Sequence, residues 1–180
     1  ELDLAVDAYK SAADRLTGAA KGEALARMAV VQEQRGMADA AASAEAAVAS
    51  DPEGVWPTIA MSHRRTHEGK TDEGVALAQK AVAAGGGAAA TTALAHAQEA
   101  KGDLAAAEAS YRQAIAADAT ALMPIVGLAT VLRETGRAAE ADRFPLHFHH
   151  GHRGLRRDAA HVSPVVEVQH EVSGHHHRAG

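Results

Sequence analysis

The chain has 180 residues, a formal net charge of −5 at pH 7 and an apolar content of 47%, with aromatic residues making up only 3%. It contains no cysteine, which excludes disulfide bonds and thiol chemistry. The negative charge offers no basic field for nucleic acid, and no apolar run reaches the length of about 18 residues that indicates a membrane span. We therefore expect neither nucleic acid nor a membrane-spanning segment.

Apolar residues recur along residues 1–143 with the i, i+3, i+4, i+7 spacing of a buried helix face. Alanine favours helix but buries little area per residue, so this pattern predicts thin, closely packed helices. In chain order, the pattern predicts helices over 1–15, 22–35, 37–50, 56–68 and 72–84, two within 88–121 joined by a turn at 101–103, and further helices over 123–135 and 138–143.

The helices repeat with a period of about 34 residues, which is typical of a helical solenoid. A turn glycine recurs at Gly36, Gly69, Gly102 and Gly136. A small residue recurs at Ala5, Ala40, Gly74, Ala107 and Ala141, and an alanine at Ala12, Ala47, Ala81 and Ala114. We expect Ala107 and Ala114 to be points of close helix contact.

The second helix of two units carries the pattern small-x3-aromatic-x2-Ala, as Ala5, Tyr9, Ala12 and again as Ala107, Tyr111, Ala114. In these residues the chain resembles tetratricopeptide-repeat (TPR) proteins of bacterial type, over residues 1–143. The resemblance implies an all-α fold, a right-handed α-solenoid of antiparallel helix pairs with four to five units, the first and last incomplete. On this interpretation the chain starts in the middle of a repeat, as a fragment or a processed product would.

The composition changes at Phe144, and residues 144–180 hold nine of the twelve histidines. We expect this His-rich tail to be irregular, with a short strand over 165–172 where apolar and polar residues alternate. Three origins stay open: a metal-binding segment, a tail without site chemistry, or the out-of-frame product of a GC-rich gene.

No catalytic constellation is recognisable in the sequence, and we expect no enzymatic activity, no cofactor and no metal site. His63 and His67 are four residues apart on one predicted helix, a spacing that can chelate a metal. No third ligand accompanies them, and Glu68 does not directly follow the first histidine as a zincin motif requires. The glycines at 85–87 lack the strand and the Lys-Ser/Thr pair of a phosphate-binding loop, so they predict a turn.

The resemblance also implies a binding surface, because fixed positions of the first helix in each TPR unit line a concave groove. Counting each turn glycine as position 15, these positions fall on the following residues: Trp56, Ile59, His63, Thr66 and His67, then Ala89, Thr92, His96 and Glu99, then Met123, Val126, Thr130, Arg133 and Glu134. Histidines with an ordinary pKa of about 6.5 would make binding in this groove pH-sensitive.

The resemblance favours a protein–protein interaction scaffold that holds a peptide or helix of a partner protein in the groove. Apolar contacts near Trp56, Ile59 and Val126 would hold the ligand, and the histidines and Arg133 would orient it. One alternative is the non-catalytic TPR portion of a larger enzyme or of a secretion or assembly machine. A second is metal handling through the His-rich tail. The residues indicate neither the compartment nor the oligomeric state.

Overall fold

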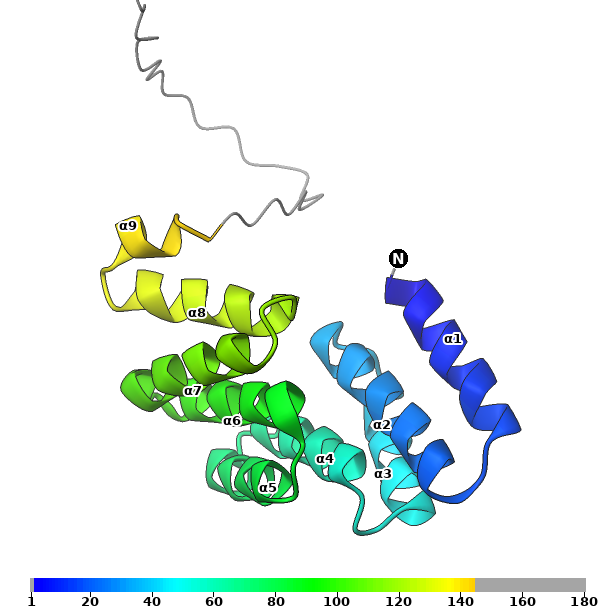
Figure 1. Ribbon diagram of the computed structural model, residues 1–180. Coiled ribbons are helices and arrows are strands. Elements are labelled where there is room, and N and C mark those ends of the chain that lie inside the picture. Colours follow the sequence, from blue (N-terminus) through cyan, green and yellow to red (C-terminus); the bar gives the residue numbers. More distant parts are fainter. Residues whose placement is uncertain (1, 145–180) are drawn as a thin grey trace, which may run out of the picture. The chain divides into compact units, whose positions relative to one another are not determined.

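The computed structural model describes residues 2–144, which form nine helices and no strand (Figure 1). The helices are α1 (Leu2–Arg15), α2 (Gly18–Gln34), α3 (Ala40–Ser50), α4 (Val55–His67), α5 (Thr71–Ala83), α6 (Gly87–Lys101), α7 (Leu104–Ala117), α8 (Leu122–Glu134) and α9 (Ala138–Ala141). The all-helical prediction is confirmed for these residues. No described helix combines the length and the apolar character needed to cross a bilayer.

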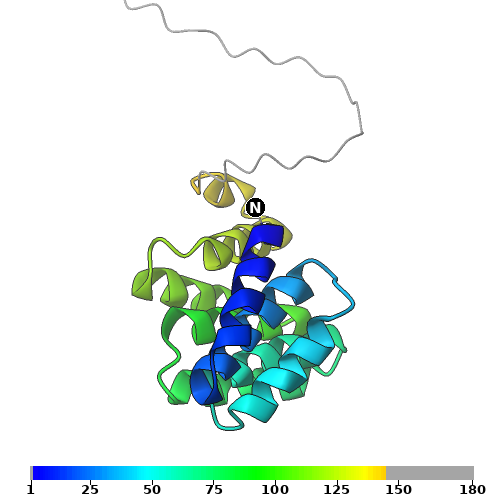
Figure 2. The same ribbon diagram turned by 90° about the vertical axis from the view of Figure 1, so that its right-hand side faces the viewer.

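The helices pack in adjacent pairs along the chain. The even-numbered helices form a continuous row, because α2 contacts α4, α4 contacts α6, and α6 contacts α8. The backbone of each odd-numbered helix instead lies close only to its neighbours in sequence; α1, for example, lies against α2 alone at one end of the helical unit (Figure 2). From α2 onwards, each described unit therefore contributes one helix to the row and one helix outside it.

Alanine forms most of the contact between the helices. Ala47, Ala81, Ala107 and Ala114 are completely inaccessible to solvent, whereas Ala12 in α1 is half-buried. Small side chains allow helix axes to approach closely, and at Gly74 the approach is so close that a Cβ atom would overlap with the Thr66 hydroxyl. The predicted close contact at Ala107 and Ala114 is consistent with their burial.

The recurring glycines end the helices of the row. Gly102 follows α6 in the left-handed conformation, with φ of 87°, and its N–H group donates to the carbonyl oxygens of Gln98 and Glu99. Gly36, Gly69 and Gly136 have φ between 63° and 79° after α2, α4 and α8. Glycine adopts this conformation without the steric cost of a Cβ atom, which explains why the residue recurs at these turns.

Several boundaries differ from the prediction. Helix α2 begins at Gly18 because Ala19, Ala20 and Lys21 are good helix formers, with no proline to delay the start. Helix α3 begins at Ala40, after a turn at residues 38–39. Phe144, the predicted first residue of the tail, packs against the apolar cluster around Leu128 and Leu132. The rest of the tail, including the strand predicted over 165–172, lies outside the described residues.

Candidate functional site

A cavity of about 620 Å³ opens along the row of even-numbered helices. All four of these helices line it, together with Tyr111 of α7 and residues of the loop before α8. The lining residues are Arg27, Val30, Gln34, Trp56, Ile59, His63, His67, Ala88, Ala89, Thr92, His96, Glu99, Tyr111, Asp118, Ala121, Leu122, Met123, Pro124, Val126, Gly127 and Thr130. We call this cavity the groove.

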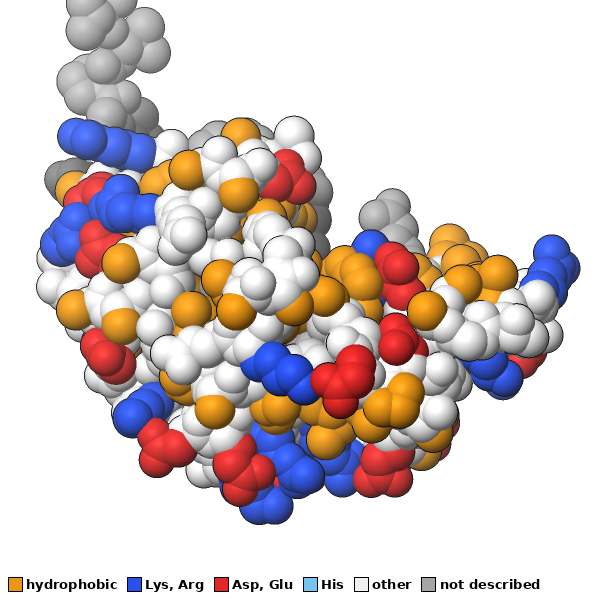
Figure 3. Space-filling model, turned by 60° about the horizontal axis from the view of Figure 1, so that its bottom comes forward, with side chains coloured by type: hydrophobic (Ala, Val, Ile, Leu, Met, Phe, Trp, Pro, Cys, Tyr) orange, Lys and Arg blue, Asp and Glu red, His pale blue; other side chains and the backbone are white. Residues whose placement is uncertain are grey.

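Outside the groove, the surface is a mixture of charges. On the face shown in Figure 3, acidic and basic side chains lie close together among small apolar ones. Among the described residues, ion pairs join neighbouring helices: Arg65 pairs with Glu73 on the following helix, and Lys101 of α6 pairs with Asp72 of α5. Exposed pairs of this kind contribute little to stability.

One part of the groove is apolar and carries the only tryptophan of the chain. Trp56 lies in the first turn of α4, one helical turn before the completely buried Ile59. The Arg27 guanidinium of α2 lies 3.6 Å from the centroid of the indole ring, and the same group pairs with Glu23. A cation over an aromatic face is attracted by the ring quadrupole, so this contact holds the indole in place.

The three histidines of the described chain meet in the middle of the groove. The ring of His96 on α6 lies 5.3 Å from that of His63 and 5.5 Å from that of His67, measured between centroids. His63 is buried and His67 is exposed. The Nδ1 atom of His96 is buried without a hydrogen-bond partner among residues 2–144. Three polar rings therefore line the groove with hydrogen-bonding capacity left over.

Burial sets the protonation of two of these rings. Loss of water around His63 lowers its pKa to about 3, and the neighbouring charges of His96 and His67 act in the same direction. Burial also lowers the pKa of His96, with a further contribution from His67. The expectation that these two histidines have ordinary pKa values was therefore wrong, because the sequence could not show how deeply the rings are buried. At neutral pH, His63 and His96 are uncharged donors and acceptors.

A second polar contact joins α6 and α7 at the wall of the groove. The Tyr111 hydroxyl donates a hydrogen bond of 2.6 Å to Glu99 Oε2. Burial raises the pKa of Glu99, and the hydrogen bond from Tyr111 partly offsets this effect. The ring of Tyr111 also fills the space beside Gly127 of α8, so a single side chain connects three helices.

The structure brings most of the predicted groove residues together. Those that line the groove are Trp56, Ile59, His63, His67, Ala89, Thr92, His96, Glu99, Met123, Val126 and Thr130. They come from three successive units of the repeat and line one cavity, each at a fixed offset from the turn glycine of its unit.

Three predicted residues lie outside the groove lining, and all three are in the last turn of a helix. The hydroxyl of Thr66 donates to the Ser62 carbonyl oxygen at 2.9 Å, and its side chain is buried against Gly74 of α5. Arg133 reaches Asp142 at 3.3 Å. Glu134 is exposed at the end of α8. Thr66 and Arg133 are thus held away from the groove by contacts with the odd-numbered helix that follows in the chain or with the residue that ends it.

Other lining residues were missed by the prediction. Val30 and Gln34 occupy the same offsets counted from Gly36, so extending the rule to the second unit would have found them. Arg27 and Tyr111 lie outside those offsets and reach the groove by the length of their side chains. Within residues 2–144, no group of three His, Asp or Glu side chains is arranged to hold a metal ion.

Neither the models of known protein families nor the curated proteins contain a match to this chain.

Proposed function

We propose that this chain is a TPR-type scaffold that binds a segment of a partner protein in the groove. In this proposal the helix pairs are antiparallel hairpins that stack into a right-handed superhelix, and the groove is its concave side. The support is the recurrence of small residues and turn glycines at equivalent places in successive units, together with the row of even-numbered helices that these units build.

The observation that carries the proposal is that one groove is lined by four successive helices of the row, α2, α4, α6 and α8. Packed helices are about 8–10 Å apart, so three steps cover roughly 25–30 Å. An extended peptide rises about 3.3 Å per residue, and eight or nine residues would span that distance. A polypeptide segment therefore matches the length of this surface better than a compact small molecule does.

The chemistry of the lining favours the same kind of ligand. Trp56 and Val126 lie on different helices, α4 and α8, and offer separate apolar contacts, while His96 lies on α6, the helix between these two in the row. Peptide grooves commonly combine a few buried anchor contacts with polar groups that orient the segment. The groove supplies both kinds of contact along its length.

The proposal can be tested by selecting binders from a random nine-residue peptide library with the immobilised 180-residue chain. Binding of each recovered peptide is then measured by the fluorescence of Trp56, which is the chain's only tryptophan and lines the groove. We expect peptides with at least two apolar residues, each of which changes the tryptophan emission on binding.

A pair of variants distinguishes the groove from the rest of the surface. Ala88→Phe places a ring in the groove, whereas Ala76→Phe makes the same change at an exposed position of α5. We expect the first variant to lose peptide binding and the second to retain it, with equal helicity by circular dichroism. Equal peptide binding by both variants would place the binding site elsewhere.

A further inference from the structure

The histidine cluster has hydrogen-bonding groups that contacts with apolar peptide residues would not engage. Among the described residues, none of the three imidazoles has a hydrogen-bond partner, and the Nδ1 atom of His96 is buried in this state. Polar atoms in such positions are normally satisfied, so the cluster is suited to receive a polar group from outside the chain.

The charged groups around the cluster are already engaged or face elsewhere. On α6, Glu99 accepts the hydrogen bond of Tyr111 from α7, and on α2 Arg27 pairs with Glu23. Helix α8 contributes Met123, Val126 and Thr130 to the groove, none of which carries a charge. Asp118 lines the groove from the loop before α8, and its carboxylate accepts hydrogen bonds from Thr120.

The helices on the other side of α4 and α6 use their charges in pairs. On α3, Glu45 pairs with Arg64, and on α5 the residues Asp72, Glu73 and Lys80 pair with Lys101, Arg65 and Glu53. His67 also borders a small second cavity that contains Glu33 and Glu68. Glu68 is held there by Arg64, Arg65 and Lys70. No carboxylate contributes to the pKa of His63 or His96.

We propose that the peptide bound in the groove presents an Asp or Glu side chain to His63, His67 and His96, with apolar residues on either side of it. This inference rests on the proposed peptide-binding function and specifies its ligand. The carboxylate would accept hydrogen bonds from the imidazole N–H groups, which have no acceptor among the described residues. The flanking apolar residues would contact the Trp56 and Val126 regions of the groove.

A bound carboxylate would also change the protonation of the cluster. An anion beside an imidazole favours the charged form, so binding raises the pKa values that burial has lowered. By linkage, a site that takes up a proton on binding has higher affinity at lower pH. The acidic peptide should therefore bind with proton uptake, whereas a neutral peptide should not.

The test uses matched pairs of recovered peptides that differ only by Glu and Gln at one position between apolar residues. Dissociation constants are measured by Trp56 fluorescence at pH 8 and pH 6, above the range in which the peptide carboxylate titrates. For uptake of one proton, we expect the affinity of the Glu peptide to rise about tenfold for each pH unit, or about a hundredfold from pH 8 to pH 6, with little change for the Gln peptide. Isothermal titration calorimetry in buffers that differ in ionisation enthalpy should measure the number of protons taken up on binding.

Two variants assign the effect to the cluster. His96→Gln and His67→Gln each keep a polar side chain of similar length, and His67 is exposed, so the second variant is tolerated even if the first one is not. We expect each variant, whatever its affinity for the Gln peptide, to lose the difference in affinity between the Glu and Gln peptides at pH 6.

The outcomes separate this inference from the proposed function. Equal binding of Glu and Gln peptides at both pH values would overturn the carboxylate proposal and leave peptide binding intact, provided that Ala88→Phe still blocks it. Recovery of no peptide, or of peptides that Ala88→Phe binds equally well, would overturn the proposed function and this inference with it.

Discussion

The ring of Tyr111 occupies the space that a Cβ atom on Gly127 would need. A Cβ atom there would overlap with Cζ, Cε1 and the hydroxyl oxygen of the ring. Tyr111 is only 3% exposed, and its hydroxyl is held by Glu99, so the ring has little freedom to move aside. The close approach of α7 and α8 at the groove wall therefore depends on the absence of a side chain at residue 127.

We expect Gly127→Ala to destabilise the fold, although alanine is the better helix former. Overpacking of a buried site typically costs about 1–3 kcal/mol, which exceeds the gain of about 1 kcal/mol in helix propensity over most of that range. In a Tyr111→Leu background the ring is absent, so the same substitution should be neutral or stabilising. Urea unfolding of the four chains measures this coupling, and additive effects would contradict the contact.

Ala114 provides a second test of close packing, with a control on the same helix. Ala114 is inaccessible to solvent, whereas Ala116 of α7 is exposed. Ala114→Leu should lower the free energy of unfolding by about 1–3 kcal/mol, because the added atoms have no space between the helices. Ala116→Leu should have little effect. If thermal unfolding shows the two variants to be equally stable, the repeat register that aligns Ala114 with Ala81 and Ala47 is wrong.

His63 should make the stability of the fold dependent on pH. Its pKa is about 3 in the folded state, below the value of 6.5 expected in the unfolded chain. Between pH 3 and pH 6.5, His63 is protonated in the unfolded chain but not in the folded one. The contribution of neutral His63 to the free energy of unfolding is therefore fully present above pH 6.5 and decreases as the pH falls towards 3. The slope for one group is about 1.4 kcal/mol per pH unit.

His63→Gln removes this titration and should flatten the stability profile between pH 6.5 and pH 4.5. His67→Gln is the control, because that residue is exposed and its removal leaves the buried ring in place. Denaturant unfolding at several pH values measures the slopes. A profile unchanged by His63→Gln would mean that the ring is not buried in solution.

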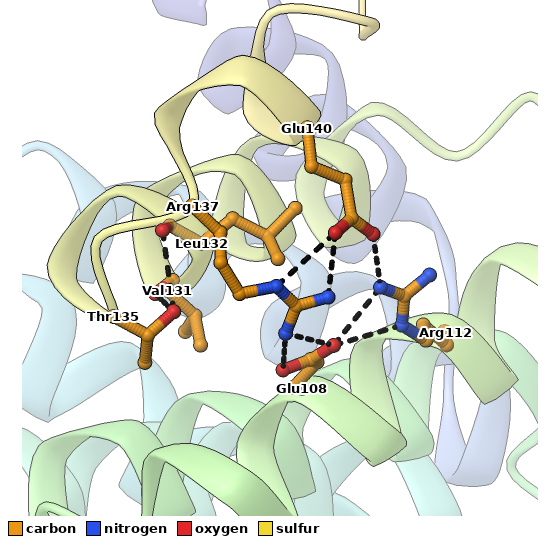
Figure 4. A network of polar contacts seen from close by, with 7 residues as sticks. All are labelled: Glu108, Arg112, Val131, Leu132, Thr135, Arg137 and Glu140. Atoms are coloured by element: carbon orange, nitrogen blue, oxygen red, sulfur yellow. Dashed lines mark hydrogen bonds and ion pairs between the residues drawn. The ribbon is translucent and has the colours of Figure 1, made fainter.

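Four charged residues join α7 to the last described helix (Figure 4). Glu108 accepts hydrogen bonds from Arg112 and Arg137, and both arginines also contact Glu140. The hydrogen bond from Arg112 is the main cause that lowers the pKa of Glu140, with Arg137 adding to it. Ala141 of this four-residue helix is buried in the apolar cluster, and the network adds a polar attachment of α9 to α7.

Arg137→Ala should therefore increase amide hydrogen exchange in residues 138–144 without unfolding the other helices. High salt should reproduce part of the effect in the unchanged chain, because the network is accessible to solvent. Arg133→Ala is the matched control, since Arg133 makes a single contact of 3.3 Å with Asp142. Equal exchange in the two variants would argue against the network as the attachment.

The sequence by itself determined the helices, their repeat and most of the groove. Periodic apolar positions and turn glycines depend on local chemistry, so they could be read from residues close together in the chain. The offset from each glycine placed His63, His96 and Val126 on one surface, because equivalent positions in successive repeats face the same direction.

Only the tertiary structure decided what these residues do in the groove. The pKa of His63 depends on its burial and on His96, which is 33 positions away in the sequence, and no local pattern reports that environment. Likewise, Thr66 occupies a predicted groove position but packs against Gly74, because the neighbouring helix leaves room for its side chain there. Secondary structure follows from interactions near in sequence, whereas burial and electrostatics at a site arise from the helices that meet there.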